Sequence, residues 1–393
     1  MRRKVSKAVA AMLVAAMAMS MAACGSNNTE GNADNAGDAP GTEGAASAAA
    51  GEDTAADGET APAADSDTNI GIVVKTAENA HFQDIAYGAV LAGQENGVKV
   101  TVQNTTTESD VAGQITMCED LISAGVKALI LTANDSDGVS TAVEAAHDAN
   151  VPFVTVDTVI NPDSNWENVA DYMPVYIGVD HTEMAYNLAK QVFDSMDGKG
   201  NVIILQGVMA ASSSQERTAG FKKAAEEYEG ITVLESEQSG EYSMDKAYEV
   251  AKDFATKYDD IDAVLCCNDL MGLGVVNAFK DNGLTVGGED GIKVVGIDGN
   301  YLALQSIEAG EMYASAYDWS ILQGYYAVEQ ALALINGETI ENDNIMTPYT
   351  VIDSANISDY IEHGAELDAW KMGTEITEVS DYMKGFVEMG EGL

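Results

Sequence analysis

Basic residues are scarce in this chain of 393 residues. There are 19 Lys and Arg residues against 64 Asp and Glu residues, and the formal net charge is -45 at pH 7. Such a chain would repel nucleic-acid phosphates, and no basic stripe in the sequence relieves that repulsion. We therefore expect no nucleic-acid partner and interpret the acidic excess as a solvated surface.

Cysteine and histidine are also rare, with four of each. Cys24 lies near the N-terminus, and the other three, Cys118, Cys266 and Cys267, are an odd number at spacings unlike a disulfide framework. The apolar run AVLCC favours Cys266 and Cys267 as small buried side chains, and whether they have a redox role stays open. The histidines show neither i, i+4 pairing nor finger spacing, so we predict no metal and no cofactor.

The N-terminus reads MRRKVSKAVAAMLVAAMAMSMAACGS, a basic start followed by a short apolar run and small residues. This pattern is typical of a secretory signal peptide, which we place at residues 1–23. The Met-Ala-Ala-Cys sequence ending at Cys24 resembles a bacterial lipobox, so we expect a lipidated Cys24. The alternative is an ordinary cleaved signal in which Cys24 is incidental. Residues 24–68 are small, polar and acidic, which predicts a disordered tether.

Apolar runs alternate with amphipathic helical patterns through the rest of the chain. The runs include IGIVV, ALILT and PFVTVD, and a second series begins near residue 176 with YIGVD, NVIILQG, DAVLCC and KVVGID. Continuous apolar runs between helices indicate parallel strands covered on both faces. We predict an α/β fold of two doubly wound parallel-sheet lobes joined by a multi-crossing hinge.

The same pattern predicts the boundaries of the lobes. The N-terminal lobe would comprise residues 69–179 and 319–345, and the C-terminal lobe residues 180–318 and 346–374. Residues 375–393 would form a tail, whose order the sequence does not define. Crossings between the lobes are expected near 179–180, Asp318 and Ile345, and the final strand is expected near 346–352.

Polar side chains stand where these predicted strands end. In an open α/β sheet, ligands bind outside the carboxyl ends of the strands. Carboxylates accept hydrogen bonds from vicinal hydroxyls, amides and guanidinium groups donate to ligand oxygens, and an aromatic face can cover a sugar ring. The polar residues are Asn79, Asp135, Asp157, Arg217, Asn268, Asp269, Asp298 and Asp318, with aromatic residues at Phe82, Tyr242, Tyr301 and Trp319.

Several of these residues also have a structural interpretation. Asn268 or Asp269 could cap the helix that follows, and we expect Asp269 to be structural and Asn268 to face a ligand. Asp298 could equally be a cap or turn residue. Tyr242 and Trp319 could belong to the core.

The span from about Ile70 to Asn356 resembles the type I periplasmic sugar-binding proteins of ABC transporters, the group of the ribose- and galactose-binding proteins. The segments that carry the resemblance are TAENAHF, ANDSDGVSTAVEAAHDANVPFVTVD, SQERTAGF, CCNDLMGLGVVNAF and KVVGIDG, in this order. The resemblance implies ligand contacts from Asn79, Phe82, Asp157, Arg217, Tyr242, Asn268 and Asp298, with Asp318 near a hinge crossing. His81 and Thr158 replace an aromatic residue and an arginine of the family.

The function that follows is a lipid-anchored extracytoplasmic receptor. It would be a monomer that captures a neutral monosaccharide between two closing lobes and delivers it to an ABC permease. We expect a neutral ligand because Arg217 is the single cation expected in the site, against Asp157, Asp298 and Asp318. The alternatives are a chemoreceptor carrier or a binder of a furanosyl signal. A glycoside-processing enzyme is a further alternative, since two carboxylates could act as acid and base, but no GxSxG or phosphate-loop motif is present. We therefore expect no enzymatic activity.

Overall fold

The computed structural model describes residues 67–370, 372, 374, 376 and 380–393. The described residues belong to one compact unit. The predicted signal peptide, Cys24 and the tether up to residue 66 lie outside them. Among the described helices, none combines the length and the apolarity that crossing a bilayer would require.

The first lobe is built on a six-stranded, fully parallel sheet with the order β11-β5-β4-β3-β1-β2. Its strands are β1 (Asn69–Thr76), β2 (Lys99–Thr105), β3 (Ala128–Leu131), β4 (Phe153–Val156), β5 (Val175–Gly178) and β11 (Asn344–Met346). Its helices are α1 (Ala80–Glu95), α2 (Val111–Ser123), α3 (Ser140–Asp148), α4 (Val169–Tyr172) and α10 (Ser320–Ile335).

The second lobe repeats the architecture with the strand order β12-β10-β9-β8-β6-β7. Its strands are β6 (Lys199–Leu205), β7 (Gly230–Glu235), β8 (Ala263–Cys266), β9 (Lys293–Ile297), β10 (Ala314–Tyr317) and β12 (Thr350–Asp353). Its helices are α5 (His181–Ser195), α6 (Ser212–Glu226), α7 (Met244–Lys257), α8 (Asp269–Asp281) and α9 (Tyr301–Glu308). β12 is antiparallel to β10 at the sheet edge.

The chain passes from one sheet to the other after β5, after β10 and after β11. These crossings give the multi-crossing hinge between two doubly wound lobes that the sequence predicts. One detail differs: the final apolar run, expected as a single strand near 346–352, is split into β11 and β12, which belong to different sheets. The split lets the last crossing join both lobes.

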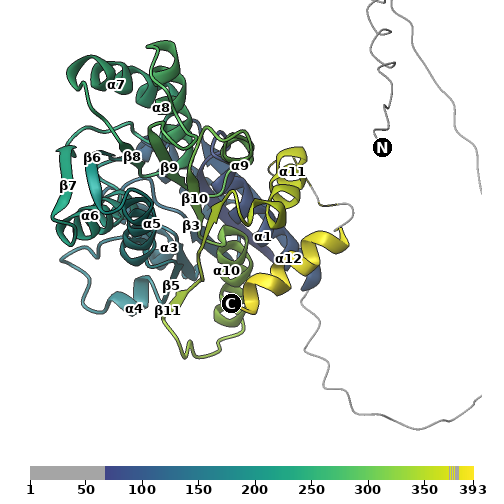
Figure 1. Ribbon diagram of the computed structural model, residues 1–393. Coiled ribbons are helices and arrows are strands. Elements are labelled where there is room, and N and C mark those ends of the chain that lie inside the picture. Colours follow the sequence, from purple (N-terminus) through teal and green to yellow (C-terminus); the bar gives the residue numbers. More distant parts are fainter. Residues whose placement is uncertain (1–66, 371, 373, 375, 377–379) are drawn as a thin grey trace, which may run out of the picture. The chain divides into compact units, whose positions relative to one another are not determined.

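Helices α1 and α10 pack closely in the first lobe, as Figure 1 shows. The close approach depends on two glycines. A Cβ at Gly88 of α1 would meet the carbonyl oxygen of Ile321, and a Cβ at Gly324 of α10 would meet the carbonyl oxygen of Ile85. Because these obstacles are backbone atoms, a larger residue at either position would push the helices apart.

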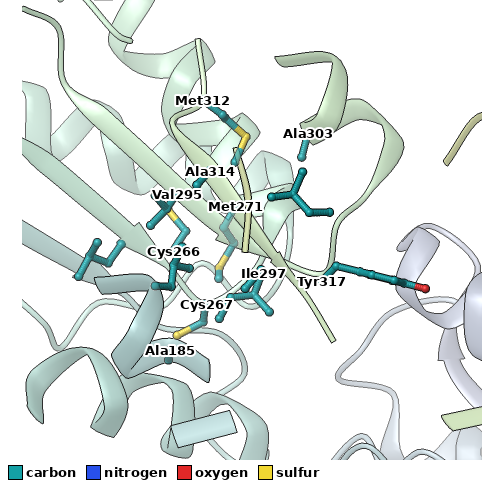
Figure 2. Close-up of a cluster of buried hydrophobic side chains, with 14 of the residues drawn as sticks. Ala185, Cys266, Cys267, Met271, Val295, Ile297, Ala303, Met312, Ala314 and Tyr317 are labelled. Carbon is teal, nitrogen blue, oxygen red and sulfur yellow. The ribbon is translucent and has the colours of Figure 1, made fainter. Parts of the chain in front are cut away.

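Cys266 and Cys267 lie in the hydrophobic core of the second lobe (Figure 2). Both are fully buried free thiols among side chains such as Met271 and Val295. Burial raises the pKa of both thiols, and in Cys266 the neighbouring Cys267 and Asp269 raise it further. A protonated, buried thiol is a poor nucleophile and a poor metal ligand, which fits the structural interpretation of the AVLCC run.

The C-terminal segment adds a short 3-10 helix, η1 (Ile357–Asp359), and two helices, α11 (Ile361–Ala369) and α12 (Asp381–Glu391). Helix α11 contacts α1 of the first lobe and α9 of the second, and α12 contacts α10. Phe386 of α12 stacks on Trp319 at 4.8 Å and on His363 at 3.9 Å between ring centroids. The predicted tail therefore contains a helix that packs on the body.

Candidate functional site

A cavity lies where the carboxyl ends of strands from both sheets meet. The lining residues come from both lobes: Lys75, Asn79, His81, Phe82, Glu108, Asp157, Ser213, Arg217, Tyr242, Asn268 and Asp298. The cavity volume is about 10 Å³, room for about one water molecule. The lobes are thus in a closed arrangement, in which their own polar side chains fill the space between them.

Asn79 and Asn268 each have two roles, one in a helix and one in the cavity. The side-chain oxygen of Asn79 caps α1 by accepting from the His81 amide, and that of Asn268 caps α8 by accepting from the Met271 amide. Capping fixes the orientation of each side chain, so the amide N–H groups are left to face the cavity. The two interpretations of Asn268 are therefore compatible.

Asp269 has a structural role, as expected. Its Oδ1 accepts from Ser315 Oγ at 2.7 Å, and its Oδ2 accepts from the backbone N–H of Asn300 at 2.7 Å. These bonds tie α8 to β10 and to the loop after β9. Burial and nearby Asp298 hold the pKa of Asp269 well above its usual range.

Asp157 follows β4 and lies beside two nitrogen groups and one hydroxyl group. Its Oδ1 is 3.3 Å from His81 Nε2, its Oδ2 is 3.6 Å from Lys75 Nζ, and the same Oδ2 accepts from Thr158 Oγ1 at 2.7 Å. Burial alone would raise the pKa of Asp157, but Lys75 and His81 hold it well below its usual range. Asp157 is therefore a carboxylate, and it can accept hydrogen bonds from ligand hydroxyls.

His81 is positively charged because carboxylates surround it. Its Nδ1 is 3.5 Å from Asp318 and 3.9 Å from Asp298, while its Nε2 faces Asp157. Burial lowers the pKa of His81, but Asp318, Asp157 and Asp298 outweigh burial and raise it well above the usual range. The imidazolium partly neutralises three aspartates contributed by both lobes.

Asp298 follows β9 and faces the first lobe. Its Oδ2 accepts from Asn79 Nδ2 at 3.1 Å, and its Oδ1 is 3.5 Å from Arg217 Nη1. Burial raises the pKa of Asp298 to about 6, with His81 and Arg217 opposing the increase and Asp318 adding to it.

Arg217 of α6 is held by second-lobe groups. It donates to the Cys267 carbonyl at 2.8 Å and, through Nε, to His181 Nδ1 at 3.3 Å. Burial and the positive Arg217 lower the pKa of His181 to about 4, so this histidine is neutral. With its Nδ1 accepting from Arg217, its Nε2 donates to the Asp157 carbonyl at 3.2 Å.

Asp318 lies behind the cavity and does not line it. It is fully buried, 3.8 Å from Arg217 Nη2, and neither carboxylate oxygen has a hydrogen-bond partner among the described residues. The remaining predicted contacts, Phe82 and Tyr242, supply two aromatic rings to the cavity wall. Trp319 instead belongs to the core beside Phe386, and Tyr301 lines a second small cavity beside α11.

Lys75, His81, Glu108 and Ser213 also line the cavity and were not among the predicted contacts. Arg217 is not the single cation that the sequence predicts for the site, because Lys75 and a protonated His81 also line the cavity. The sequence contains signals that could have identified two of these residues. Lys75 is a charged residue at the end of the buried run IGIVV, and Glu108 lies in the loop after β2, a strand end that the prediction did not include.

A wider cleft of about 530 Å³ lies next to the cavity. Glu108 and Tyr242 line both spaces. The outer walls come from both lobes: Thr76, which ends β1, and Ser109 lie on one side, and Met244 and Leu302, in the first turns of α7 and α9, lie on the other. Glu108 and Tyr242 therefore lie between the cleft and the cavity.

Direct contacts between the lobes keep the cavity small. Asn79 donates to Asp298 and accepts from Asn300 Nδ2 at 3.0 Å, and the Val159 amide donates to Ser212 Oγ at 2.9 Å. A sugar-sized ligand needs a larger space than one water molecule. Entry of such a ligand therefore requires the lobes to separate and these hydrogen bonds to break.

Comparison with known proteins agrees with this geometry. Residues 70–339 match the periplasmic binding protein domain family, so the chain belongs to that family. Its relatives are sugar-binding proteins and not enzymes, which agrees with the prediction from the sequence that this chain is not an enzyme.

Among its relatives, the ribose import binding protein of Bacillus subtilis is 30% identical over 272 residues, which cover 69% of this chain and 83% of that protein. The D-ribose/D-allose-binding protein of Pseudomonas aeruginosa is 27% identical over 291 residues, covering 72% and 88%. The solved structure of an ABC transporter periplasmic solute-binding protein from Actinobacillus succinogenes, with bound D-allose, is 28% identical with a TM-score of 0.68. The match covers 75% of this chain and all of that one.

Proposed function

We propose that this protein is a lipid-anchored, extracytoplasmic receptor that binds a neutral monosaccharide between its lobes and delivers it to an ABC permease. The main support is the cavity itself, where carboxylates, amides, a guanidinium and two aromatic rings from both lobes converge. Such groups bind several hydroxyls and one ring face together.

The charges of the site favour a neutral ligand. Lys75, Arg217 and protonated His81 stand against the carboxyl groups of Asp157, Asp298, Asp318 and Glu108. These charges nearly cancel, so an added charge on the ligand would remain unbalanced in a buried site. The relatives support the same class, because their names specify ribose, D-ribose or D-allose.

Binding would operate by exchange of the hydrogen bonds that join the two lobes beside the cavity. When the lobes separate, Asn79, Asp298 and Asn300 lose their mutual bonds and become available to ligand hydroxyls. When the lobes close on the ligand, those groups bond to the sugar and no longer to each other. The ligand thereby stabilises the closed form in proportion to its preference for that form.

Isothermal calorimetry against a ligand panel tests the proposal. The panel contains glucose, galactose, allose, ribose, xylose, inositol, a sugar phosphate and sialic acid. We expect at least one neutral member to bind, and at about 100 times its Kd to stabilise the protein by roughly 2.7 kcal/mol. Tight binding of an anion with every neutral member silent would refute the proposal.

The anchor rests on the sequence alone, because Cys24 lies outside the described residues. We expect the wild-type chain to incorporate a radiolabelled lipid precursor in a bacterial host and to sediment with membranes. The Cys24→Ala chain should incorporate none. Equal absence of label in both chains would contradict the anchor and would leave the sugar-binding proposal intact.

A further inference from the structure

The last part of the chain is a further link between the two lobes, in addition to the three crossings. The matched family domain ends at residue 339, and the described residues of 357–393 form η1, α11 and α12, here named the C-terminal strap. Residues 354–356 alone separate it from β12, so it is rooted in the second lobe. Helix α11 packs on α9 of that lobe, where a Cβ at Gly364 would lie 3.1 Å from the Tyr301 ring.

The C-terminal strap also packs on the first lobe. The Trp370 ring meets the Tyr87 ring of α1 edge-on, with 5.3 Å between the ring centroids, and Gln94 Nε2 of α1 donates to the Ile376 carbonyl at 2.7 Å. Further along the chain, α12 contacts α10, which also belongs to the first lobe (Figure 1). A segment rooted in the second lobe therefore ends on two helices of the first.

A buried polar cluster joins the C-terminal strap to the crossing between β10 and α10. Asp84 of α1 is 1% exposed, and its Oδ1 is 3.2 Å from His363 Nε2 of α11. Its Oδ2 accepts from Tyr317 Oη at 2.6 Å and from Ser320 Oγ at 2.7 Å, one residue at each end of the crossing. Burial raises the pKa of Asp84, but His363 and these hydrogen bonds hold it below its usual range. Asp84 is therefore a carboxylate that joins α1, α11 and the crossing.

The C-terminal strap covers the middle of the same crossing. Trp319 is fully buried there, with a left-handed φ of 50°. Phe386 of α12 stacks on its indole ring, and a Cβ at Gly390 would collide with that ring. When two lobes move apart, a few hinge residues absorb the change in backbone angles. Side chains packed tightly on Trp319 therefore oppose that change.

We propose that the C-terminal strap is a latch that restricts the opening of the two lobes. Because its root is in the second lobe and its far end packs on the first, separation of the lobes must detach it from α1. It thus favours the closed form of the unliganded protein and lowers the fraction of molecules whose cleft is open. The inference goes beyond the proposed function, since it concerns the motion of the lobes and holds for any ligand.

Distances between spin labels in the unliganded protein test the latch. Thr107 and Asp245 are exposed on opposite walls of the wider cleft, so labels on Thr107→Cys and Asp245→Cys report the separation of the lobes. The chain also carries Cys24→Ala. The three remaining cysteines are buried and should not react with the label.

The double variant His363→Ala/Trp370→Ala releases the latch. It removes two contacts with α1 and changes no residue of α1 or of the crossing. Glu388→Ala is the matched control, because Glu388 is exposed on α12. We expect one short distance in wild type and in the control. In the double variant, the population at longer distance should be about tenfold larger than in wild type.

Thermal unfolding verifies that each variant is folded. Trp370→Ala alone removes a half-buried ring and should shift the distances in the same direction, so the test does not depend on the double variant being stable. If folded variants give the distance distribution of wild type, the C-terminal strap does not restrict opening and the proposal is refuted. Silence of every sugar in the calorimetric panel would refute the proposed function and leave this test unchanged, because the measurement contains no ligand.

Discussion

The carboxyl group of Glu108 should make the stability of the unliganded protein depend on pH. Burial raises its pKa from the ordinary 4.5 to about 7, and nearby Asp298 adds to the increase, while Lys75, His81 and the hydrogen bond from Asn79 oppose it. Between these two pH values the folded protein holds a proton that the unfolded chain has released. The free energy of unfolding therefore falls as pH rises through this window.

The size of the effect follows from the gap between 4.5 and about 7. At roughly 1.4 kcal/mol per pH unit, the charged Glu108 costs the folded state about 3 kcal/mol at pH 8. Glu108→Gln removes this cost, because a neutral amide resembles the protonated acid and can still accept from Asn79. Below pH 4.5 the two proteins should be about equally stable.

Urea denaturation of wild type and Glu108→Gln between pH 4.5 and 8 measures the difference directly. Other titrating groups are shared by the two proteins, so the difference between them isolates Glu108. We expect the variant to gain up to about 3 kcal/mol relative to wild type as pH rises, or roughly 5 °C in Tm. A difference that stays constant with pH, or that favours wild type at pH 8, would refute the reasoning.

Three further substitutions test other parts of the molecule. Asn268→Ser keeps a hydroxyl to cap α8 but loses the side-chain amide that faces the cavity. In thermal unfolding, the stability of the unliganded variant should stay within about 0.5 kcal/mol of wild type, while its sugar affinity in calorimetry falls about tenfold. Equal affinity of the two proteins would contradict this prediction. Arg217→Ala leaves Asp298 and Asp318 buried with less positive charge and should cost about 3–5 kcal/mol in urea denaturation; a cost below about 1 kcal/mol would show that the arginine does not hold these carboxylates. Phe386→Ala removes the ring that stacks on Trp319 and His363. If α12 unfolds together with the body, the free energy of unfolding should fall by about 3–5 kcal/mol in urea denaturation. Early release of the C-terminus in limited proteolysis, with an unchanged main urea transition, would show that α12 unfolds separately.

The two-lobe fold could be predicted because a strand that is buried on both faces consists of consecutive apolar residues. Runs such as ALIL of β3 and AVLC of β8 are fully buried, so neither face of the strand tolerates polar side chains. The division of the final run between β11 and β12 could not be predicted this way. It depends on which sheet edge is within reach at the third crossing, and that is a property of the assembled lobes.

Strand ends also led to most of the cavity residues, since parallel strands deliver their carboxyl ends to one edge. The rule misplaced Asp318, which lies behind His81, and passed over Glu108. The charge states of the two buried histidines could not be predicted from the sequence, because they depend on which charged groups the fold brings close to each ring. His81 is protonated because aspartates from three separate strand ends of two lobes converge on it, whereas His181, equally buried, is neutral beside Arg217.

The backbone of the site explains why residue type alone gave an incomplete picture. Asp157, Tyr242 and Asp298 line the cavity with positive φ angles of 61°, 57° and 121°, and Trp319, next to Asp318, has 50°. Non-glycine residues in such conformations cost on the order of 1–3 kcal/mol each, so stability alone would favour glycine or asparagine there. An aspartate or an aromatic residue kept in a strained conformation indicates that the position is held for its side chain. Strained positions at the ends of β4 and β9 and in the loop before α7 thus mark the same cavity that the hydrogen bonds and charges define, and they do so independently of both.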